Sequence, residues 1–370
     1  MRNLHNLLFA ILLLPTWLSA QWGGPVFESP VVHDDNTVTF SYLAPEADSV
    51  SVSGQFMDGE LAMRRGDDGL WSVTTTAVAP DMYPYQFSVD GVRTADPKNS
   101  KIFPNEGFQA SILEVTGPVP LVHTLTDVPH GTVSYNYYSS PELGERPVVV
   151  YTPPGYADSD RDYPVLYLLH GTTDTEETWT KVGRANLILD NLIAAGEAEP
   201  MVVVMPYGRA YPKISKSSGS LREWPNLQAF KQDFYENLRP FVEANFRLRD
   251  DKDARAIAGF SGGGGTSLYL GLNDTETFAN VIGFAPGMRV DEIDRNNAEA
   301  FADVEGTNER LKMFWIAVGE DDFTYNAIKE YFQVLDEKGI EYESFISGGG
   351  HTWMNCKLYL TILAKKLFKD

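Results

Sequence analysis

Residues 255–272 read RAIAGFSGGGGTSLYLGL, and this stretch decides the fold. An apolar run at residues 255–258 is typical of a buried strand, and a second apolar segment follows at residues 266–272. Between them stands the pattern Gly-x-Ser-x-Gly, centred on Ser261. A serine on a tight strand-to-helix turn is forced into strained backbone angles, and glycines two positions away permit the close approach that this turn needs. The pattern therefore predicts a Ser261 hydroxyl raised above a sheet edge beside a helix N-terminus, although a structural glycine-rich turn is the alternative.

Other apolar runs without alternation surround this stretch. They lie at residues 148–152, 165–170, 201–205 and 313–318. Such runs suit strands that are buried on both faces of a mostly parallel sheet. Helical spacing recurs between them, for example from Phe230 to Val242 and from Ile328 to Leu335. Strands that alternate with helices predict an α/β domain whose sheet is covered on both sides.

The chain before this domain has a different pattern. Polar and apolar residues alternate at residues 38–42, 49–53 and 85–89, and turn residues separate the runs. This predicts a small all-β, immunoglobulin-like sandwich. Residues 117–120, GPVP, form a stiff connector because two prolines hold the chain extended. We therefore expect a sandwich over residues 21–116, a linker over 117–121 and the α/β domain over 122–370.

The first twenty residues resemble a secretory signal peptide. Arg2 supplies a positive start, residues 7–14 are an apolar run, and small residues end the segment at Ala20. A membrane anchor is the alternative, but the apolar run is short for a bilayer. We expect cleavage after Ala20 and a secreted or periplasmic protein. Cys356 is the single cysteine, so the exported chain has no internal disulfide.

The composition narrows the range of partners. The formal net charge is −21, and an acidic surface repels phosphate backbones and anionic lipid. We therefore expect neither nucleic acid nor a membrane as a partner. Histidines and cysteines lack zinc-type spacing, and residues 262–265 lack the Lys-Ser/Thr ending of a phosphate-binding loop. We expect no metal and no cofactor.

A serine hydroxyl needs a base to become a nucleophile at neutral pH, and His351 is the candidate. Of the six histidines, His170 and His351 are the two within or after the core strands. His170 ends a buried strand, where a structural role in supporting the next loop is expected. His351 lies in a glycine-rich loop before the final helix and follows Ser261 in the chain, as the base of this kind of site should.

The base needs an orienting acid, and the oxyanion needs two backbone donors. Residues 319–323, GEDDF, follow a core strand, and the pattern alone leaves Asp321 and Asp322 open. One donor should be the N–H of Gly262, directly after the nucleophile. The other should come from the loop after residue 170, where Thr172 is the candidate.

These residues together resemble carbohydrate esterase family one, the feruloyl and acetylxylan esterases related to esterase D. The resemblance covers about residues 122–370 and is carried by five segments: residues 146–156, 163–171, 256–263, 319–323 and 349–353. It implies the α/β-hydrolase fold and places the acid on Asp322, with Asp321 in reserve. The sequence departs from the family at Gly262, where many relatives carry Met, and at Cys356–Lys357, where relatives often have Trp-Arg.

The N-terminal part resembles the carbohydrate-binding sandwich modules that precede glycogen-branching and debranching enzymes. Residues 68–71 and 83–89 carry this likeness. The resemblance implies attachment to plant cell-wall polysaccharide or a role in shaping the esterase cleft. Trp71 is interpreted as a packing residue and not as a sugar platform.

Aromatic side chains on the loops are candidates for substrate contact, with ordinary packing as the alternative for each. The candidates are Trp179, Tyr207, Tyr211, Trp224, Phe323 and Trp353. The leading hypothesis is hydrolysis of feruloyl esters on arabinoxylan through an acyl-enzyme on Ser261. Acetylxylan esterase and siderophore trilactone esterase are alternative activities, and a non-catalytic polysaccharide-binding protein is a further alternative.

Overall fold

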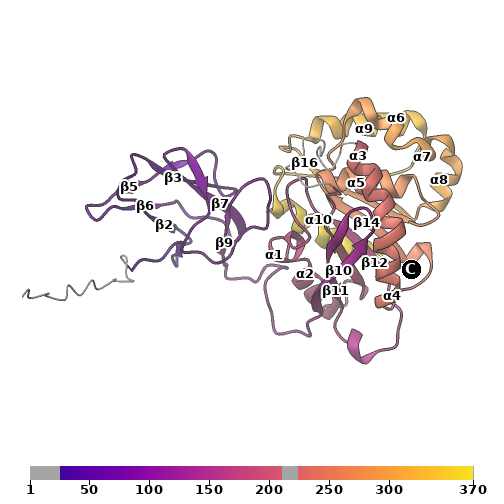
Figure 1. Ribbon diagram of the computed structural model, residues 1–370, viewed down its shortest axis with the longest axis horizontal. Coiled ribbons are helices and arrows are strands. Elements are labelled where there is room, and N and C mark those ends of the chain that lie inside the picture. Colours follow the sequence, from indigo (N-terminus) through magenta and orange to yellow (C-terminus); the bar gives the residue numbers. More distant parts are fainter. Residues whose placement is uncertain (1–25, 211–223, 370) are drawn as a thin grey trace, which may run out of the picture.

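The computed structural model describes residues 26–210 and 224–369. The expected signal peptide, residues 1–20, lies outside these residues. Figure 1 shows a smaller all-β part, built from the N-terminal strands, beside a larger α/β part. The predicted fold class, an all-β sandwich followed by an α/β-hydrolase domain, is confirmed.

The N-terminal part is a sandwich of two antiparallel sheets. One sheet has the order β1-β2-β6-β5, with β1 Val31–Val32, β2 Val38–Leu43, β6 Leu70–Thr74 and β5 Arg64–Arg65. The other has the order β4-β3-β7-β8, with β4 Leu61–Ala62, β3 Val50–Gly54, β7 Asp81–Val89, β8 Val92–Thr94, and β9 Ser111–Val115 on the β7 edge. Trp71 is buried in this core and its indole N–H donates to the Ala44 carbonyl at 2.9 Å, so its interpretation as a packing residue is confirmed.

The α/β part is built on an eight-stranded sheet. Its order is β10-β11-β13-β12-β14-β15-β16-β17, with β10 Thr132–Ser140, β11 Gly144–Thr152, β12 Val165–Leu169, β13 Val202–Pro206, β14 Arg255–Phe260, β15 Asn280–Phe284, β16 Met313–Gly319 and β17 Glu343–Ser347. The first two pairings are antiparallel and the others are parallel. The structure thus confirms a mostly parallel sheet and adds β10, β15 and β17 to the expected strands. Most of the central strands are fully buried, which explains their unbroken apolar runs.

Helices cover both faces of this sheet (Figure 1). They are α1 Thr178–Lys181, α2 Ala185–Ala194, α3 Trp224–Asp233, α4 Arg239–Asn245, α5 Gly262–Leu272, α6 Ile293–Asn296, α7 Ala298–Ala302, α8 Val304–Arg310, α9 Tyr325–Lys338 and α10 Trp353–Lys366; a π-helical segment, Phe234–Leu238, joins α3 to α4, and single 3₁₀ turns lie at Tyr156–Asp158, Lys252–Ala254 and Val290–Glu292. Helix α5 packs on β14 and β15, and α10 packs on α2. Cys356 is a buried residue of α10.

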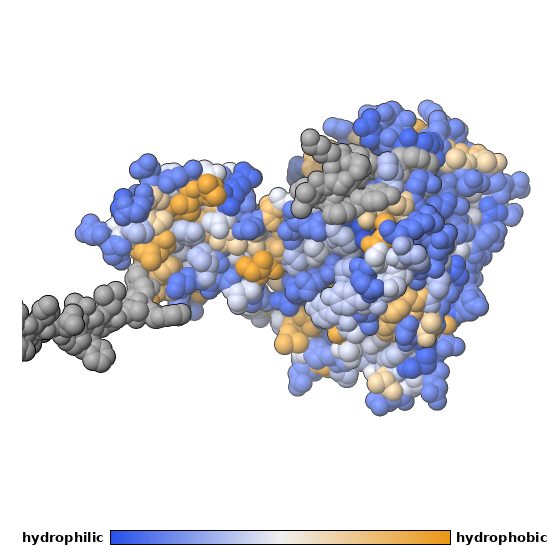
Figure 2. All heavy atoms as spheres, in the orientation of Figure 1, coloured by the Kyte–Doolittle hydropathy of each residue, from blue (hydrophilic) through white to orange (hydrophobic). Residues whose placement is uncertain are grey.

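The two parts share a continuous hydrophobic core. Phe103 and Ile112 of the N-terminal part belong to the same buried cluster as the central sheet residues. Lys357 of α10 is buried and pairs with Asp81 at the start of β7. Figure 2 shows a largely hydrophilic α/β surface on this face, with hydrophobic residues on the sandwich and near the junction. The sandwich is therefore docked on the α/β part through packed side chains.

In the part of the chain that the structure describes, no helix has both the length and the apolar character that a membrane crossing requires.

Candidate active site

Ser261 occupies the sharp turn between β14 and α5. Its backbone angles are φ 54° and ψ −119°, a combination that residues with a Cβ adopt only under strain. Two hydrogen bonds hold the strained peptide groups: Ser261 N–H donates to the Phe284 carbonyl at 2.9 Å, and Gly287 N–H donates to the Ser261 carbonyl at 2.6 Å. The strain is thus built into the fold and presents the Ser261 side chain at the sheet edge.

The two outer glycines of Gly-x-Ser-x-Gly have a steric cause. A Cβ on Gly259 would lie 2.4 Å from the Gly263 carbonyl carbon. A Cβ on Gly263 would lie 2.2 Å from the His170 carbonyl oxygen at the end of β12. Neither distance is compatible with a side chain, so the crossing of α5 over β12 and β14 requires glycine at both positions.

His351 and Asp322 are hydrogen-bonded. Nδ1 of His351 lies 2.8 Å from Oδ2 of Asp322, and both Thr324 N–H and Thr324 Oγ1 donate to Oδ1 of Asp322 at 2.8 and 2.7 Å. Although burial acts to raise it, the hydrogen bonds from His351 and Thr324 hold the pKa of Asp322 below its ordinary value. Asp321 is exposed. The structure therefore places Asp322, and not Asp321, against the imidazole.

The ionised Asp322 carboxylate fixes the tautomer of His351. Since Nδ1 donates its proton to Asp322, Nε2 is left as the acceptor, which is the arrangement that a general base requires. Ser261 and His351 line the same cavity. Among the described residues, their side chains form no direct hydrogen bond with each other. Such contacts are often long without substrate and tighten when the substrate is bound.

The cavity above Ser261 has a volume of about 360 Å³. From the α/β part, its walls include Thr172, Ser261, Phe323, His351 and Trp353. The Phe323 side chain is 76% exposed, and its ring centroid lies 4.4 Å from that of His351. Trp353 is buried beneath the cavity and contacts Phe260 edge-on.

Of the two expected oxyanion donors, Thr172 lines the same cavity and Gly262 directly follows Ser261 in the chain. Gly262 is the first residue of α5, where the backbone N–H groups have no partner within the helix. Thr172 lies on the cavity wall in the turn after β12, which Asp174 N–H closes by donating to the Gly171 carbonyl at 3.2 Å. Both positions follow strands that end at this edge of the sheet.

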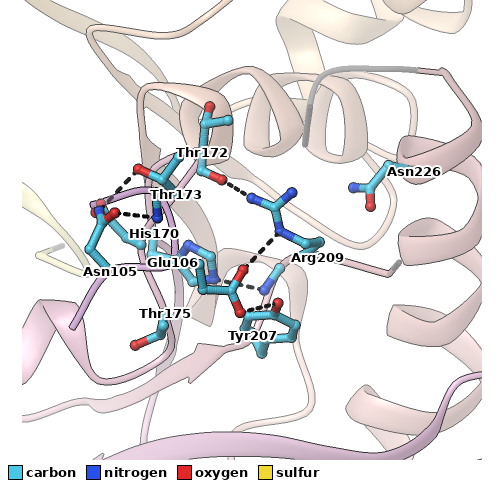
Figure 3. Close-up of polar contacts among 12 residues, drawn as sticks. Asn105, Glu106, His170, Thr172, Thr173, Thr175, Tyr207, Arg209 and Asn226 are labelled. Atoms are coloured by element: carbon cyan, nitrogen blue, oxygen red, sulfur yellow. Dashed lines mark hydrogen bonds and ion pairs between the residues drawn. The ribbon is translucent and has the colours of Figure 1, made fainter. Parts of the chain in front are cut away.

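His170 has a structural role, as expected. Its Nε2 accepts from Gly208 N–H at 3.0 Å, so Nδ1 carries the proton and donates to the Gly171 carbonyl at 2.8 Å. Burial lowers the pKa of His170 to about 4, and the ring is therefore neutral at physiological pH. It links the loop after β12 to the loop after β13 (Figure 3).

One of the expected substrate contacts is wrong. Trp179 is completely buried, donates its indole N–H to the Leu169 carbonyl at 3.0 Å and packs edge-on against Trp353, so substrate cannot reach it. Tyr207 is not among the residues that line the cavity, and its hydroxyl donates to Glu106 at 2.6 Å, so its contact with substrate stays a prediction. Tyr211 and the side chain of Trp224 lie outside the described part of the chain.

A role of the sandwich in shaping the esterase cleft was expected from the resemblance, but the residues that form one side of the cavity were not predicted from the sequence. Five residues of the N-terminal part line it: Gln55, Pro84, Phe103, Asn105 and Phe108. Phe103 and Phe108 stack with ring centroids 5.3 Å apart. Their contact with the site depends on how the sandwich docks, and no local pattern indicates that. The clue in the sequence is only the polar turn at residues 104–107, PNEG.

No group of three or more His, Cys, Asp or Glu side chains within residues 26–210 and 224–369 could hold a metal ion.

Two family models match the chain. The Esterase model matches residues 140–353, and carbohydrate-binding module 48, the isoamylase N-terminal domain, matches residues 26–105. A curated relative from Xylanibacter ruminicola, named endo-1,4-beta-xylanase/feruloyl esterase, is 28% identical over 353 residues. That match covers 93% of this chain and 46% of the relative, so this chain spans about half of the relative's length.

Solved structures show the same fold. A ferulic acid esterase is 25% identical with a TM-score of 0.57, and the match covers 64% of this chain and 98% of that one. The enterobactin esterase of Shigella flexneri is 18% identical with a TM-score of 0.63, and the match covers 90% of this chain and 94% of that one. The second likeness, at this identity, is one of fold alone.

Proposed function

This chain belongs to the Esterase family and is a carboxylic ester hydrolase, and from that premise we propose that it releases ferulic acid from feruloylated plant cell-wall arabinoxylan. The observation that carries the proposal is an aromatic-walled cavity that also contains Ser261 and His351. The relative named as a xylanase/feruloyl esterase and the solved ferulic acid esterase support the same substrate class.

In the proposed reaction, Ser261 Oγ attacks the ester carbonyl while Nε2 of His351 takes the hydroxyl proton. Asp322 stabilises the imidazolium through the hydrogen bond to Nδ1. The N–H groups of Gly262 and Thr172 hold the oxyanion of the tetrahedral intermediate. His351 then gives this proton to the departing sugar oxygen, so the sugar leaves as an alcohol and feruloyl-Ser261 remains. Water deprotonated by His351 attacks this acyl-enzyme, and His351 returns the proton to Ser261 Oγ as ferulate is released.

The cavity supports an aromatic acyl group over acetate. A volume of about 360 Å³ is far more than an acetyl group fills, whereas the exposed rings of Phe323 and Phe108 are available to a hydroxycinnamoyl group. Acetylxylan esterase activity remains the nearest alternative, since it uses the same proposed catalytic residues.

A siderophore trilactone esterase is the second candidate. It is favoured by the enterobactin esterase structure, whose fold matches this chain across both parts. The formal net charge of −21 argues against it, because catecholate siderophores are anionic. We also propose, from the pattern at residues 1–20, that the protein is exported to the periplasm or the medium.

The test is release of ferulate from feruloylated xylo-oligosaccharides by the wild-type protein and by Ser261→Ala. We expect release by the wild type and none above background by Ser261→Ala. Equal release by the two proteins would overturn the assignment of Ser261. Parallel assays with acetylated xylan, methyl ferulate and a catecholate trilactone rank the alternatives, and faster turnover of either rival substrate would replace the feruloyl proposal.

A further inference from the structure

Asn105 of the sandwich reaches across to the turn that carries Thr172 (Figure 3). Its Nδ2 donates to Thr173 Oγ1 at 3.0 Å and to Asp174 Oδ1 at 2.8 Å. Its Oδ1 accepts from Gly107 N–H and Phe108 N–H at 2.7 and 3.1 Å. The amide is therefore fixed at both ends, with its oxygen in its own loop and its nitrogen on the turn.

The backbone next to Asn105 holds the same turn. Glu106 N–H donates to the Thr173 carbonyl at 2.7 Å, and Asn105 pairs with Asp174 as an isolated antiparallel bridge. The segment at residues 105–106 is thus joined to the turn by main chain and side chain together.

The Glu106 carboxylate holds the turn from a second direction. It accepts from the Tyr207 hydroxyl at 2.6 Å and lies 3.3 Å from Nε of Arg209, which is buried. The Arg209 guanidinium in turn donates to the Thr172 carbonyl. The peptide group that follows Thr172 is therefore fixed by a chain of contacts that begins in the sandwich (Figure 3).

Asp174 closes the network on the inner side of the turn. Its Oδ2 accepts from Gly171 N–H at 3.1 Å, and the carboxylate is buried. Burial raises the pKa of Asp174 to about 7, although the hydrogen bonds from Asn105 and Gly171 act to lower it. A buried carboxylate with few donors depends on each of them, so loss of Asn105 would loosen the turn.

We propose that Asn105 and Glu106 are positioning residues for ester hydrolysis, which hold the turn at residues 171–174 so that Thr172 N–H stays directed at the oxyanion. The sandwich is then a structural part of the catalytic centre in addition to any role in binding polysaccharide. This inference rests on the proposed function, since it takes Ser261 as the nucleophile and Thr172 as an oxyanion donor.

A positioning role has a distinct kinetic signature. The oxyanion exists only in the transition state and the intermediate, so a displaced donor lowers kcat and leaves KM for a small ester nearly unchanged. Complete loss of one donor lowers turnover by about 10²–10³-fold, and a misplaced donor should lower it by at least about tenfold. A residue that merely lines the cavity would instead change KM for a bulky ester.

The experiment uses the full chain with Asn105→Ala and Glu106→Gln, assayed on 4-nitrophenyl acetate and on methyl ferulate. Asn99→Ala is the matched control, because the Asn99 amide donates to Tyr85 Oη and the Ile112 carbonyl inside the sandwich, at 3.1 and 2.9 Å. We expect kcat on 4-nitrophenyl acetate to fall at least about tenfold in Asn105→Ala and Glu106→Gln, with KM changed less than about twofold. Asn99→Ala should retain the wild-type kcat.

The pH profile gives a second readout. Asn105→Ala removes a donor from the Asp174 carboxylate, so the pKa of this carboxyl rises. Because the ionised carboxylate accepts from Gly171 N–H and so holds the turn, the acid limb of kcat should move to higher pH. An unchanged kcat in both variants would overturn the proposal, as would a change confined to KM for methyl ferulate. If Asn105→Ala does not fold, the kcat of Glu106→Gln still tests the proposal, because this variant keeps the hydrogen bond from its backbone N–H to the Thr173 carbonyl.

The two proposals fail separately. Hydrolysis of 4-nitrophenyl acetate without release of ferulate would reject the feruloyl substrate and leave the positioning test intact. Activity of Ser261→Ala on 4-nitrophenyl acetate would reject the proposed nucleophile, whatever the result for Asn105.

Discussion

Nδ1 of His351 lies 2.8 Å from Oδ2 of the buried Asp322, whereas Asp321, which precedes Asp322 in the chain, is exposed to solvent. In Asp322→Asn, the new amide cannot accept the Nδ1 proton with its nitrogen, so the imidazole takes the wrong tautomer. We expect kcat for ester hydrolysis to fall by about 10⁴-fold, as in other serine triads. Steady-state kinetics with 4-nitrophenyl acetate measures this.

Asp321→Asn is the control for this substitution, because it removes a carboxylate of the same loop without touching the imidazole. We expect it to retain kcat within about twofold. Loss of activity in Asp321→Asn together with retention in Asp322→Asn would transfer the orienting role to Asp321.

Phe323→Ala tests the aromatic wall. The exposed Phe323 ring contributes to binding only if the acyl group carries a ring of its own, and such a pair contributes about 0.5–1.5 kcal/mol. KM for methyl ferulate should therefore rise about two- to twelvefold, with little change for 4-nitrophenyl acetate. Equal changes for the two esters would mean that the ring supports His351 and does not select the acyl group.

Gly263→Ala tests the steric account of the serine turn. The added methyl group would lie 2.2 Å from the His170 carbonyl oxygen, so α5 must move away from β12. We expect the free energy of unfolding to fall by about 3 kcal/mol, together with a large loss of activity. Gly348→Ala is the stability control, since a Cβ there meets no atom within 4 Å. Similar melting temperatures for the two variants would contradict the account.

Asp174 predicts a pH dependence of stability. Its pKa is about 7 in the folded protein and 3.8 for the free group, so the native state disfavours the ionised carboxylate. The stability it contributes is complete below about pH 4 and is lost as the pH rises towards about 7. Relative to that of Asp174→Asn, the free energy of unfolding of the wild type should fall by up to about 4 kcal/mol across this interval. Above about pH 7 the difference between the two proteins should stay constant. Urea unfolding of both proteins across the interval measures the difference, and a pH-independent difference would contradict the prediction.

The sequence was sufficient for the features that local sterics determine. Gly259 and Gly263 must be glycine because the backbone passes too close for a side chain, so the serine turn is recognisable from five residues. The buried strands were recognisable because both faces of the sheet are covered. By contrast, β17 was missed because its residues are half exposed, with the sequence ESFIS, and therefore lack an apolar run.

Features that depend on tertiary docking could not be predicted from the sequence. Trp179 and Phe323 are both aromatic residues on loops, yet one is buried under Trp353 and the other is exposed on the cavity wall. Likewise, the sequence does not distinguish Asn105 from other polar turn residues, because its contact with Asp174 forms only when the sandwich docks on the α/β part. Side-chain type sets what such a residue can do, and long-range packing decides where it acts.

Labelling with a fluorophosphonate, followed by peptide mass spectrometry, tests the central claim most directly. The reagent reacts with a serine that a neighbouring base has activated and mimics the tetrahedral intermediate. We predict one phosphonyl group per chain, attached to Ser261, and greatly slowed labelling in His351→Ala. A wild-type protein that stays unlabelled, or that carries the label on another residue, would contradict the assignment of Ser261 and His351 as nucleophile and base.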